Sequence, residues 1–495
     1  MRSPATLTAL RGHSDEAFRI ATVKDSAPVV APVVSPETVV DIPAGRRNLA
    51  LVSLLVTMIM ANLDTSIVNV ALPQLSRDLR VSPSDAVWVA TAFLLALACS
   101  IPAMSGLADQ IGRKRMYVIG TPIFTLASLG CALSPSLGWL LTGRIIQGIA
   151  AAMIFAVTIP LYRHLFPPER LGFILGINAM VVAIGISAGP TLGGLILDNL
   201  SWPWLFLINV PIGVVATVLG AAFLPHRQPP RTSYDLVGAL VAAAAIASFL
   251  LGIHQLADVG TLWSAVVLLL ISAALIFAFV RIERRAVRPV IPPDLFSGRF
   301  SLAVLTAFWS FFGQGVAFIA LPFLFQTAYH ATPLQSALLF TPWPVVIVIV
   351  APLSGRLADR YSSSLLAVIG LSIFTLGLLS LALLGGHPPV GQVLASTALC
   401  GFGFAVFQSP NNRDMMSAAP MKYASSAAGI LNINRSLAQS IGAGAVSMAL
   451  VLAGASTASL VSQARAANSV LLVGVAGAAL SVVISIVKLR QARSH

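Results

Sequence analysis

Two opposite charges lie within apolar stretches of the sequence, where a charge is costly. Asp64 is the only acidic residue well inside such a stretch, and Arg144 lies in another. At 1.5 Å per helical residue, they would lie roughly 12 Å and 10 Å below the same surface. Burial favours the neutral form of a carboxylate, whereas a nearby guanidinium favours its charged form. Asp64 is therefore a candidate proton carrier paired with Arg144, and a static buried ion pair is the alternative.

Both charges must be held by elements that lie in lipid. Of the 495 residues, 57% are hydrophobic and 9% charged, against about 25% charged in soluble proteins. The apolar runs are continuous and about 20 residues long, as in membrane-crossing helices, whereas barrel strands alternate over about 10 residues. The composition therefore predicts an all-α membrane protein. The three cysteines show no metal-ligand spacing, and no metal site is expected.

Fourteen apolar runs predict fourteen transmembrane helices, arranged as six, two and six. Residues 1–47 are polar and rich in Pro and Ala, as in a disordered cytoplasmic tail. A six-helix bundle is expected over 48–224, two extra helices with linkers over 225–299, a second six-helix bundle over 300–487, and a cytoplasmic tail at 488–495. The expected spans are 48–72, 86–107, 116–134, 137–160, 173–195, 204–224, 236–256, 261–280, 300–326, 335–355, 365–384, 391–410, 428–453 and 469–487.

The distribution of Lys and Arg predicts the orientation. With the N-terminus inside, 25 of the 30 basic residues fall in inside segments, three fall outside and two lie within spans. Because basic residues collect on the cytoplasmic side, both termini are expected in the cytoplasm of a protein of the plasma (cell inner) membrane. The net charge of +13 then reflects topology rather than binding to nucleic acid.

A three-residue repeat marks the two six-helix blocks. Leu-Ala-Asp at 107–109 recurs at 357–359, each time closing the second span of a block ahead of arginines. Parallel halves of this kind build one class of secondary transporters. An aspartate at a helix C-terminus is unfavourably placed, and three basic residues, Arg113, Lys114 and Arg115, follow Asp109 closely. Taken alone, these charges are consistent with a plain positive-inside anchor.

Three motifs in the first block resemble signatures of the major facilitator superfamily. Residues 63–73, LDTSIVNVALP, are similar to the first-span signature of its drug:proton antiporters. Residues 107–115, LADQIGRKR, resemble the superfamily's motif between spans 2 and 3, although Ser105 and Gln110 depart from its pattern. This resemblance implies a gating loop on the inside, a latch whose Asp109–Arg113 contact holds one transport state, with a plain positive-inside anchor as the alternative. The implied gating residues are Asp109, Gly112, Arg113, Lys114, Asp359 and Arg360. Residues 144–148, RIIQG, are similar to its span-4 motif.

Two further motifs resemble the fourteen-span antiporter branch of that superfamily. Residues 185–194, GISAGPTLGG, are similar to the span-5 motif of antiporters, and residues 202–211, WPWLFLINVP, are typical of the fourteen-span branch. The glycines lie on or near one helix face and allow close approach of a neighbouring helix. A hinge or seal is expected here, with ordinary tight packing as the alternative. Its residues are Gly185, Gly189, Pro190, Gly193 and Gly194.

The resemblance implies two six-helix bundles around a central cavity and a proton-coupled exporter of small amphipathic compounds or drugs that works as a monomer. Asp64 and Arg144 would be the coupling pair, with the proton as coupling ion and no other cofactor. An exporter of one dedicated metabolite or lipid remains open. An intramembrane enzyme is disfavoured because one intramembrane acid is too few, and ATP drive because no Gly-x-x-x-x-Gly-Lys-Ser/Thr motif occurs. Candidate cavity residues are Asn62, Asn69, Gln314, Asn432, Asn434 and Arg435.

Overall fold

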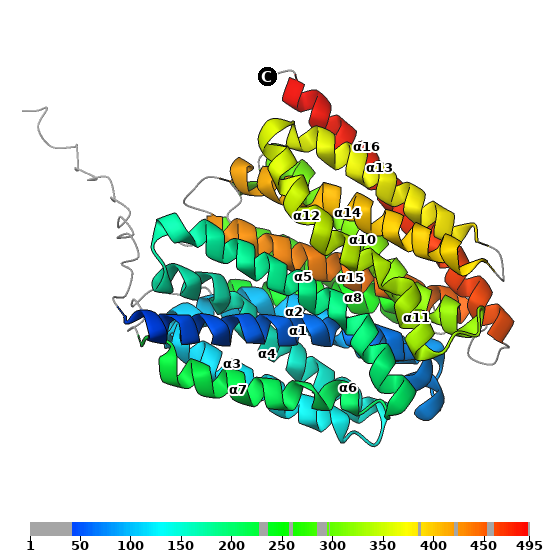
Figure 1. Cartoon of the computed structure of the whole chain (residues 1–495), viewed down its shortest axis with the longest axis horizontal. Coiled ribbons are helices and arrows are strands. Elements are labelled where there is room, and N and C mark those ends of the chain that lie inside the picture. Colours follow the sequence, from blue (N-terminus) through cyan, green and yellow to red (C-terminus); the bar gives the residue numbers. More distant parts are fainter. Residues whose placement is uncertain are drawn as a thin grey trace, which may run out of the picture. The chain divides into compact units, whose positions relative to one another are not determined.

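The elements of regular secondary structure in the described part of the computed structural model are helices (Figure 1). The structure describes residues 42–226, 236–256, 261–284, 295–296, 298–384, 388–419, 424–452 and 460–493, all within the unit Val39–His495. Their helices are α1 (Ala44–Asp78), α2 (Pro83–Ile111), α3 (Arg113–Ala132), α4 (Leu137–Leu165), α5 (Pro168–Asn199), α6 (Trp204–Leu207), α7 (Asn209–Phe223), α8 (Leu236–Gln255), α9 (Leu262–Glu283), α10 (Gly298–Thr327), α11 (Pro333–Phe340), α12 (Pro342–Arg360), α13 (Ser363–Ala382), α14 (Val390–Ala418), α15 (Ala424–Leu452) and α16 (Leu460–Arg493).

Twelve of the described helical segments are long and apolar enough to cross a membrane, rather than the fourteen expected. The two expected spans outside this set are α3 and α8, each a helix of 20 residues. α3 begins with Arg113, Lys114 and Arg115, which lower its mean hydropathy. In α8, the apolar stretch within the described residues is only Val237–Ile253. The structure therefore shows an all-helical membrane fold with twelve candidate spans.

The helix ends differ from the apolar runs because helices continue beyond the lipid-facing stretch. α1 begins at Ala44, within the expected N-terminal tail, and α16 continues to Arg493, through most of the expected C-terminal tail. Two expected spans are interrupted: Ile208 separates α6 from α7, and Thr341 separates α11 from α12. Pro342 opens α12, where proline is tolerated because the first helical N–H has no intrahelical acceptor.

The two six-helix blocks share one packing pattern. In the first block, α1 packs on α5 and α7, α2 on α4, and α3 on α4 and α7. The second block repeats each of these contacts: α10 packs on α15 and α16, α12 on α14, and α13 on α14 and α16. The Leu-Ala-Asp copies lie at matching places, at the C-terminal ends of α2 and α12. The sequence repeat therefore coincides with a structural repeat.

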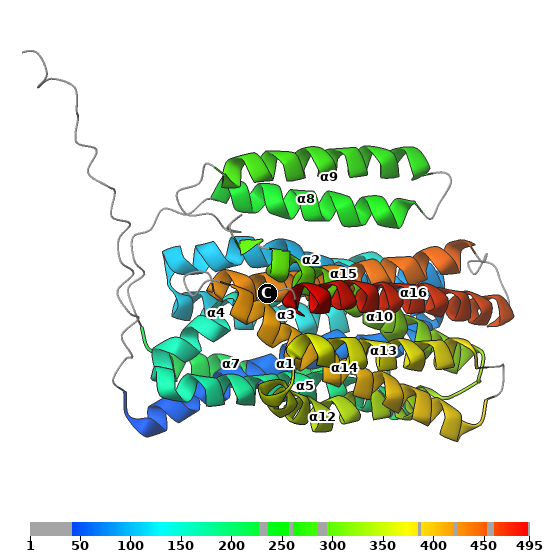
Figure 2. The ribbon, with the colours of Figure 1, turned by 90° about the horizontal axis from the view of Figure 1, so that it is seen from above.

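The blocks meet along two seams, and a helical hairpin lies outside them. α2 packs on α15, while α5 packs on α11 and α12. α8 and α9 lie side by side beyond α2 and α15 (Figure 2). Of these two, α8 contacts α2 and α15, whereas only 11% of the apolar window of α9 is buried. The two extra helices therefore lie at the periphery of the described helices.

Candidate functional site

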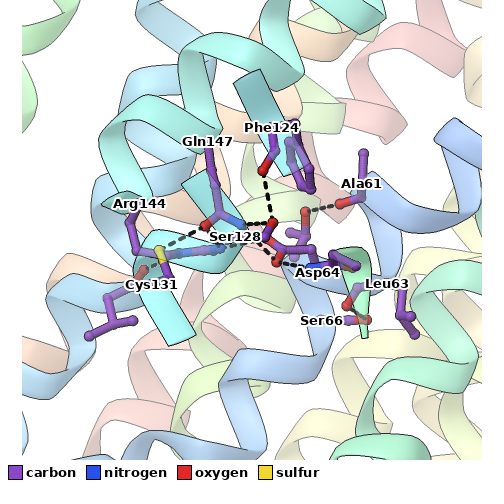
Figure 3. A network of polar contacts seen from close by, with 12 residues as sticks. Ala61, Leu63, Asp64, Ser66, Phe124, Ser128, Cys131, Arg144 and Gln147 are labelled. Atoms are coloured by element: carbon purple, nitrogen blue, oxygen red, sulfur yellow. Dashed lines mark hydrogen bonds and ion pairs between the residues drawn. The ribbon is translucent and has the colours of Figure 1, made fainter. Parts of the chain in front are cut away.

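Asp64 and Arg144 form a buried ion pair between α1 and α4. The Arg144 Nη1 lies 2.5 Å from the Asp64 Oδ2, and both residues are fully buried. The shared depth expected from the sequence therefore brings the two side chains into direct contact (Figure 3). In a medium of low dielectric constant this pairing compensates charges that would be costly alone.

Further contacts hold the Arg144 guanidinium in place. Its Nε donates to the Val89 carbonyl oxygen at 2.9 Å, and its Nη1 also donates to the Gln147 Oε1 at 2.8 Å. The guanidinium carbon lies 4.4 Å from the ring centre of Phe93 and 5.7 Å from that of Phe206. Cation–π contacts of this kind are favourable when the cation is desolvated. Arg144 thus keeps several favourable contacts besides its carboxylate partner.

Two amide side chains complete the carboxylate's surroundings, and neither is among the residues predicted for the site. The Asp64 Oδ1 accepts from the Asn209 Nδ2 at 2.8 Å and from the Gln147 Nε2 at 3.3 Å. Gln147 also donates to the Ser128 Oγ at 2.7 Å, which links α3 to the network. Asn209 and Gln147 lie within the stretches 202–211 and 144–148, so an intramembrane amide inside a motif is the signal that could identify them.

A cavity of about 610 Å³ lies between the two blocks. Its volume is within the usual range for small-molecule sites. Residues of α1, α2, α4 and α5 line it from the first block, and residues of α10, α12, α14 and α15 from the second. The lining reaches Gly176 near the start of α5 and Gly355 near the end of α12. The cavity therefore extends toward the end of the bundle where α1 begins and α16 ends.

The opposite end of the bundle is closed by contacts between the blocks. The Thr191 and Thr341 hydroxyls are 2.7 Å apart, and the Gln326 Nε2 donates to the Val70 carbonyl at 2.9 Å. The Asp198 carboxylate, at the end of α5, accepts from the Leu334 N–H at 3.2 Å and from the Thr332 hydroxyl at 3.3 Å. An anion is favourably placed there, at the N-terminus of α11.

Asp64 does not line this cavity. On α1 the lining residues include Asn62, Thr65, Ser66 and Asn69, whose spacing places them on one helix face. Asp64 points instead into the first block, toward α4 and α7. A solute in the cavity is therefore separated from the carboxylate by the backbone of α1.

Five of the six candidate cavity residues line the cavity, namely Asn62, Asn69, Gln314, Asn432 and Arg435. The expectation for Asn434 is wrong. Its side chain is 7% exposed, and its Nδ2 donates to the Val304 carbonyl of α10 at 3.1 Å. Asn434 lies between Asn432 and Arg435 in sequence but points away from the cavity, because successive helical residues are rotated about the axis.

The glycines of α5 form close helix contacts. A Cβ on Gly185 would lie 3.0 Å from the Ile59 carbonyl oxygen, and one on Gly193 would lie 3.0 Å from the Ile67 carbonyl oxygen. A Cβ on Gly189 would overlap Ser66. These three glycines face α1, whereas Gly194 faces α11, where a Cβ would lie 2.6 Å from the Ala337 Cβ. Pro190 lies inside the continuous helix α5. The stretch therefore packs α5 closely against α1 and against α11 of the second block, which is compatible with a seal and with ordinary tight packing alike.

The first segment predicted to be a gating loop is a one-residue connection between α2 and α3. Gly112 has φ 95° and ψ 136°, a backbone conformation that L side chains rarely adopt. The Arg113 Nη2 lies 3.6 Å from the Asp109 Oδ1, and the Arg113 Nη1 lies 2.8 Å from the His164 Nε2. The Lys114 Nζ donates to the Leu224 carbonyl at 2.6 Å. These contacts stay within the first block.

The second gating segment is only partly described. Arg360 is exposed at the end of α12. The side chain of Asp359 lies outside the described residues, so its predicted place in the gating loop stays a prediction. No described group of three or more His, Cys, Asp or Glu residues is placed to hold a metal ion.

Known proteins resemble the chain over most of its length. A family profile, the Major Facilitator Superfamily, matches residues 54–443. The "Uncharacterized transporter YebQ" of Escherichia coli is 37% identical and covers 83% of this chain and 90% of that protein. The "Multidrug resistance protein Stp" of Mycobacterium tuberculosis is 33% identical over 78% of this chain and 72% of that protein. The "Riboflavin transporter RibZ" of Clostridioides difficile is 29% identical over 76% of this chain and 82% of that protein.

Solved structures share the fold at low identity. A bacterial homologue of the human lysosomal transporter Spinster, in an inward-facing and unoccupied conformation, has a TM-score of 0.66 at 14% identity. That likeness covers 91% of this chain and 98% of the homologue. A POT family transporter in complex with 5-aminolevulinic acid has a TM-score of 0.64 at 16% identity, with coverages of 92% and 98%.

Proposed function

The chain belongs to the major facilitator superfamily, and we propose that it exports small amphipathic compounds from the cytoplasm in exchange for protons. It is a transporter rather than an enzyme, as are the relatives it matches. Among those relatives are multidrug resistance proteins and a tetracenomycin C resistance and export protein. The finer assignment, export of such compounds by proton exchange, rests on the observations below.

The cavity between the blocks is the observation that carries the export proposal. It is large enough for a drug-sized compound, and its exposed lining is mainly apolar with amide and hydroxyl groups interspersed. Contacts between α5 and α11 close the far end. With both termini in the cytoplasm, the cavity faces the cytoplasm, so this conformation is the one that loads solute for export.

The buried ion pair supports proton coupling. Protonation of Asp64 would remove the negative charge that Arg144 pairs with, and the pair would separate more easily. Because α1 carries Asp64 on one face and cavity residues on another, rearrangement around Asp64 would move the cavity wall. Protonation from outside would then favour release of solute, and proton loss toward the cytoplasm would restore the loading state.

We further propose that α3 and α8 also cross the membrane, which gives fourteen spans. α3 packs against α4 and α7 inside the first block, and α8 lies against α2 and α15. With fourteen crossings both termini lie on one side, which agrees with the excess of Lys and Arg in the inside segments. The bundle surrounds a complete cavity by itself, so we expect a functional monomer.

Export of one dedicated metabolite is the second candidate function. The riboflavin transporter among the relatives favours it, because that protein's name gives a single vitamin. The same fold and the same coupling pair would serve either function. The breadth of compounds that bind separates the two: structurally unrelated binders support multidrug export, whereas one compound class supports a dedicated carrier.

Proton release from purified protein tests the proposal. In weakly buffered solution with a pH-sensitive dye, addition of a substrate should release protons from the wild-type protein, and a panel of amphipathic compounds identifies the substrates. In proteoliposomes, transport of these compounds should follow an imposed pH gradient. Transport that ignores the gradient, with no proton release for any transported compound, would contradict proton exchange.

A further inference from the structure

The central cavity contains one charged side chain, contributed by α15. Arg435 lies near the middle of this helix and lines the cavity together with Asn432, Ser436 and Gln439, which share its helix face. No other residue with an ionisable side chain is among the described residues that line the cavity. The described cavity wall therefore carries one positive charge and no negative charge.

The Arg435 guanidinium has no partner in the described part of the chain. The ion pairs there join Arg144 to Asp64, Arg113 to Asp109 and Lys488 to Asp414. No hydrogen bond to a described residue involves Arg435, which is half-buried at the cavity surface. Arg144 at membrane depth is paired, whereas Arg435 at membrane depth is not. An arginine in the membrane usually pairs or marks the path of a substrate or ion.

The remaining cavity wall is mainly apolar, with amide and hydroxyl groups interspersed. Four phenylalanines of α4, α10 and α14 lie at the wall: Phe155 is half-buried, whereas Phe311, Phe318 and Phe404 are buried. The Gln439 Nε2 donates to the Gln314 Oε1 at 3.0 Å, which fixes two amides beside Arg435. Aromatic faces with a few oriented polar groups are typical of sites for small organic molecules.

The charge distribution of the described cavity wall favours a negatively charged ligand. A guanidinium binds carboxylate or phosphate oxygens through paired N–H donors, and burial strengthens such an ion pair. A cationic compound would meet a like charge and no carboxylate among the described lining residues, because Asp64 is paired with Arg144 and lies on another face of α1. We propose that the transported compounds carry an anionic oxygen group on an aromatic body, with Arg435 as counter-ion. This inference rests on the proposed export through the central cavity.

Binding of matched probes tests the proposal. The probes are naphthoate, its neutral amide and the corresponding naphthylmethylamine, followed by a panel of larger aromatic acids with their amides and amines. Affinities are measured at constant pH by titration calorimetry on the full chain in phosphatidylcholine nanodiscs. The wild-type protein should prefer the acids. Arg435→Gln should weaken acid binding by roughly tenfold to hundredfold and leave amide binding within about twofold.

Two control variants separate the charge effect from damage to the fold. Arg435→Lys keeps the charge and should keep the preference for acids. Arg356→Gln removes an exposed arginine of α12 that does not line the cavity, and it should bind like the wild type. Equal binding of amines and acids, equal loss of acids and amides in Arg435→Gln, or no acid binding across the panel would each overturn the proposal.

A second series of nanodiscs, with an anionic lipid, tests whether the anionic group that Arg435 binds comes from a lipid or from a soluble acid. Nanodiscs containing phosphatidylglycerol should leave the acid affinities unchanged. If phosphatidylglycerol competes with acids in the wild type but not in Arg435→Gln, Arg435 binds a lipid headgroup in the membrane, and the proposal that it is the counter-ion of a transported aromatic acid is overturned. The outcome is also separable from proton exchange: acid binding through Arg435 without proton-coupled export would refute only the proposed function. Proton-coupled export of amines would refute only the present inference.

Discussion

Replacement of Asp64 by Asn tests proton coupling most directly, because the amide has the shape of the protonated acid. In the wild type, the carboxylate accepts from Arg144, Asn209 and Gln147. Breaking a buried ion pair from one side typically costs about 3–5 kcal/mol. The Arg144 guanidinium would keep its bonds to the Val89 and Gln147 oxygens. We therefore expect a loss at or below the lower bound, about 3 kcal/mol.

The assay measures both the stability and the transport activity of each variant. Thermal unfolding in detergent gives the stability, and proteoliposomes with an imposed pH gradient give the transport. If Asp64 carries the proton, Asp64→Asn inserts at normal levels and lowers the unfolding midpoint moderately. Efflux against a gradient and substrate-induced proton release then fall to background at every pH. If the pair is only structural, poor expression and low thermal stability are the main effects.

The double variant Asp64→Asn with Arg144→Gln separates these outcomes. It removes both charges, so no uncompensated cation remains in the core. A structural pair predicts recovery of stability and of some transport. A proton carrier predicts a stable protein without coupled transport. Normal pH-driven efflux by well-folded Asp64→Asn would refute the mechanism.

Three further outcomes follow from the packing and the topology. Gly189→Ala should lower the free energy of unfolding by about 1–3 kcal/mol and slow transport, because its Cβ would overlap Ser66. Gly130→Ala, with open space around it, should behave like the wild type in thermal unfolding and efflux. Asp198→Ala removes the carboxylate at the start of α11, which should cost the closed state about 1 kcal/mol. The end of the bundle closed by α5 and α11 should then open about fivefold more often. Spin-label distances across that end measure this, and Asp85→Ala, which removes a carboxylate bonded within its own block, should leave them unchanged. Reporter fusions at the two termini should both give cytoplasmic signals; opposite signals would refute the orientation.

The position of Asp64 has a consequence for the transport cycle. The carboxylate and the cavity lie on different faces of α1, so proton and solute need not compete for one group. If Asp64 carries the proton, as proposed, coupling passes through movement of α1 relative to α4 and to α5. Gly185, Gly189 and Gly193 of α5 lie directly against α1. Such indirect coupling suits a carrier whose solute is anionic, since the solute would not need the carboxylate as its counter-ion.

The amino-acid sequence by itself determined the class of protein, the order of the helices and the depth of the charged residues. Lipid imposes a continuous apolar run on each crossing helix, and the fixed rise per residue turns position along a run into depth. The pairing of Asp64 with Arg144 therefore follows from their positions along two apolar runs, and the contact between them confirms it. The repeat at 107–109 and 357–359 also locates matching helix ends in the two blocks.

Only the tertiary structure decided which face of each helix meets which neighbour. Depth is a position along one axis, whereas contact between side chains also depends on how each helix is rotated and packed. An apolar run gives almost no information about that rotation, because lipid and protein interior are both apolar. For this reason the expectation for Asn434 is wrong, and sequence position does not connect Gln147 and Asn209 to Asp64. For the same reason Arg435, one of several polar residues on α15, is distinguished as the one charge in the described cavity wall only by the packing that places it there.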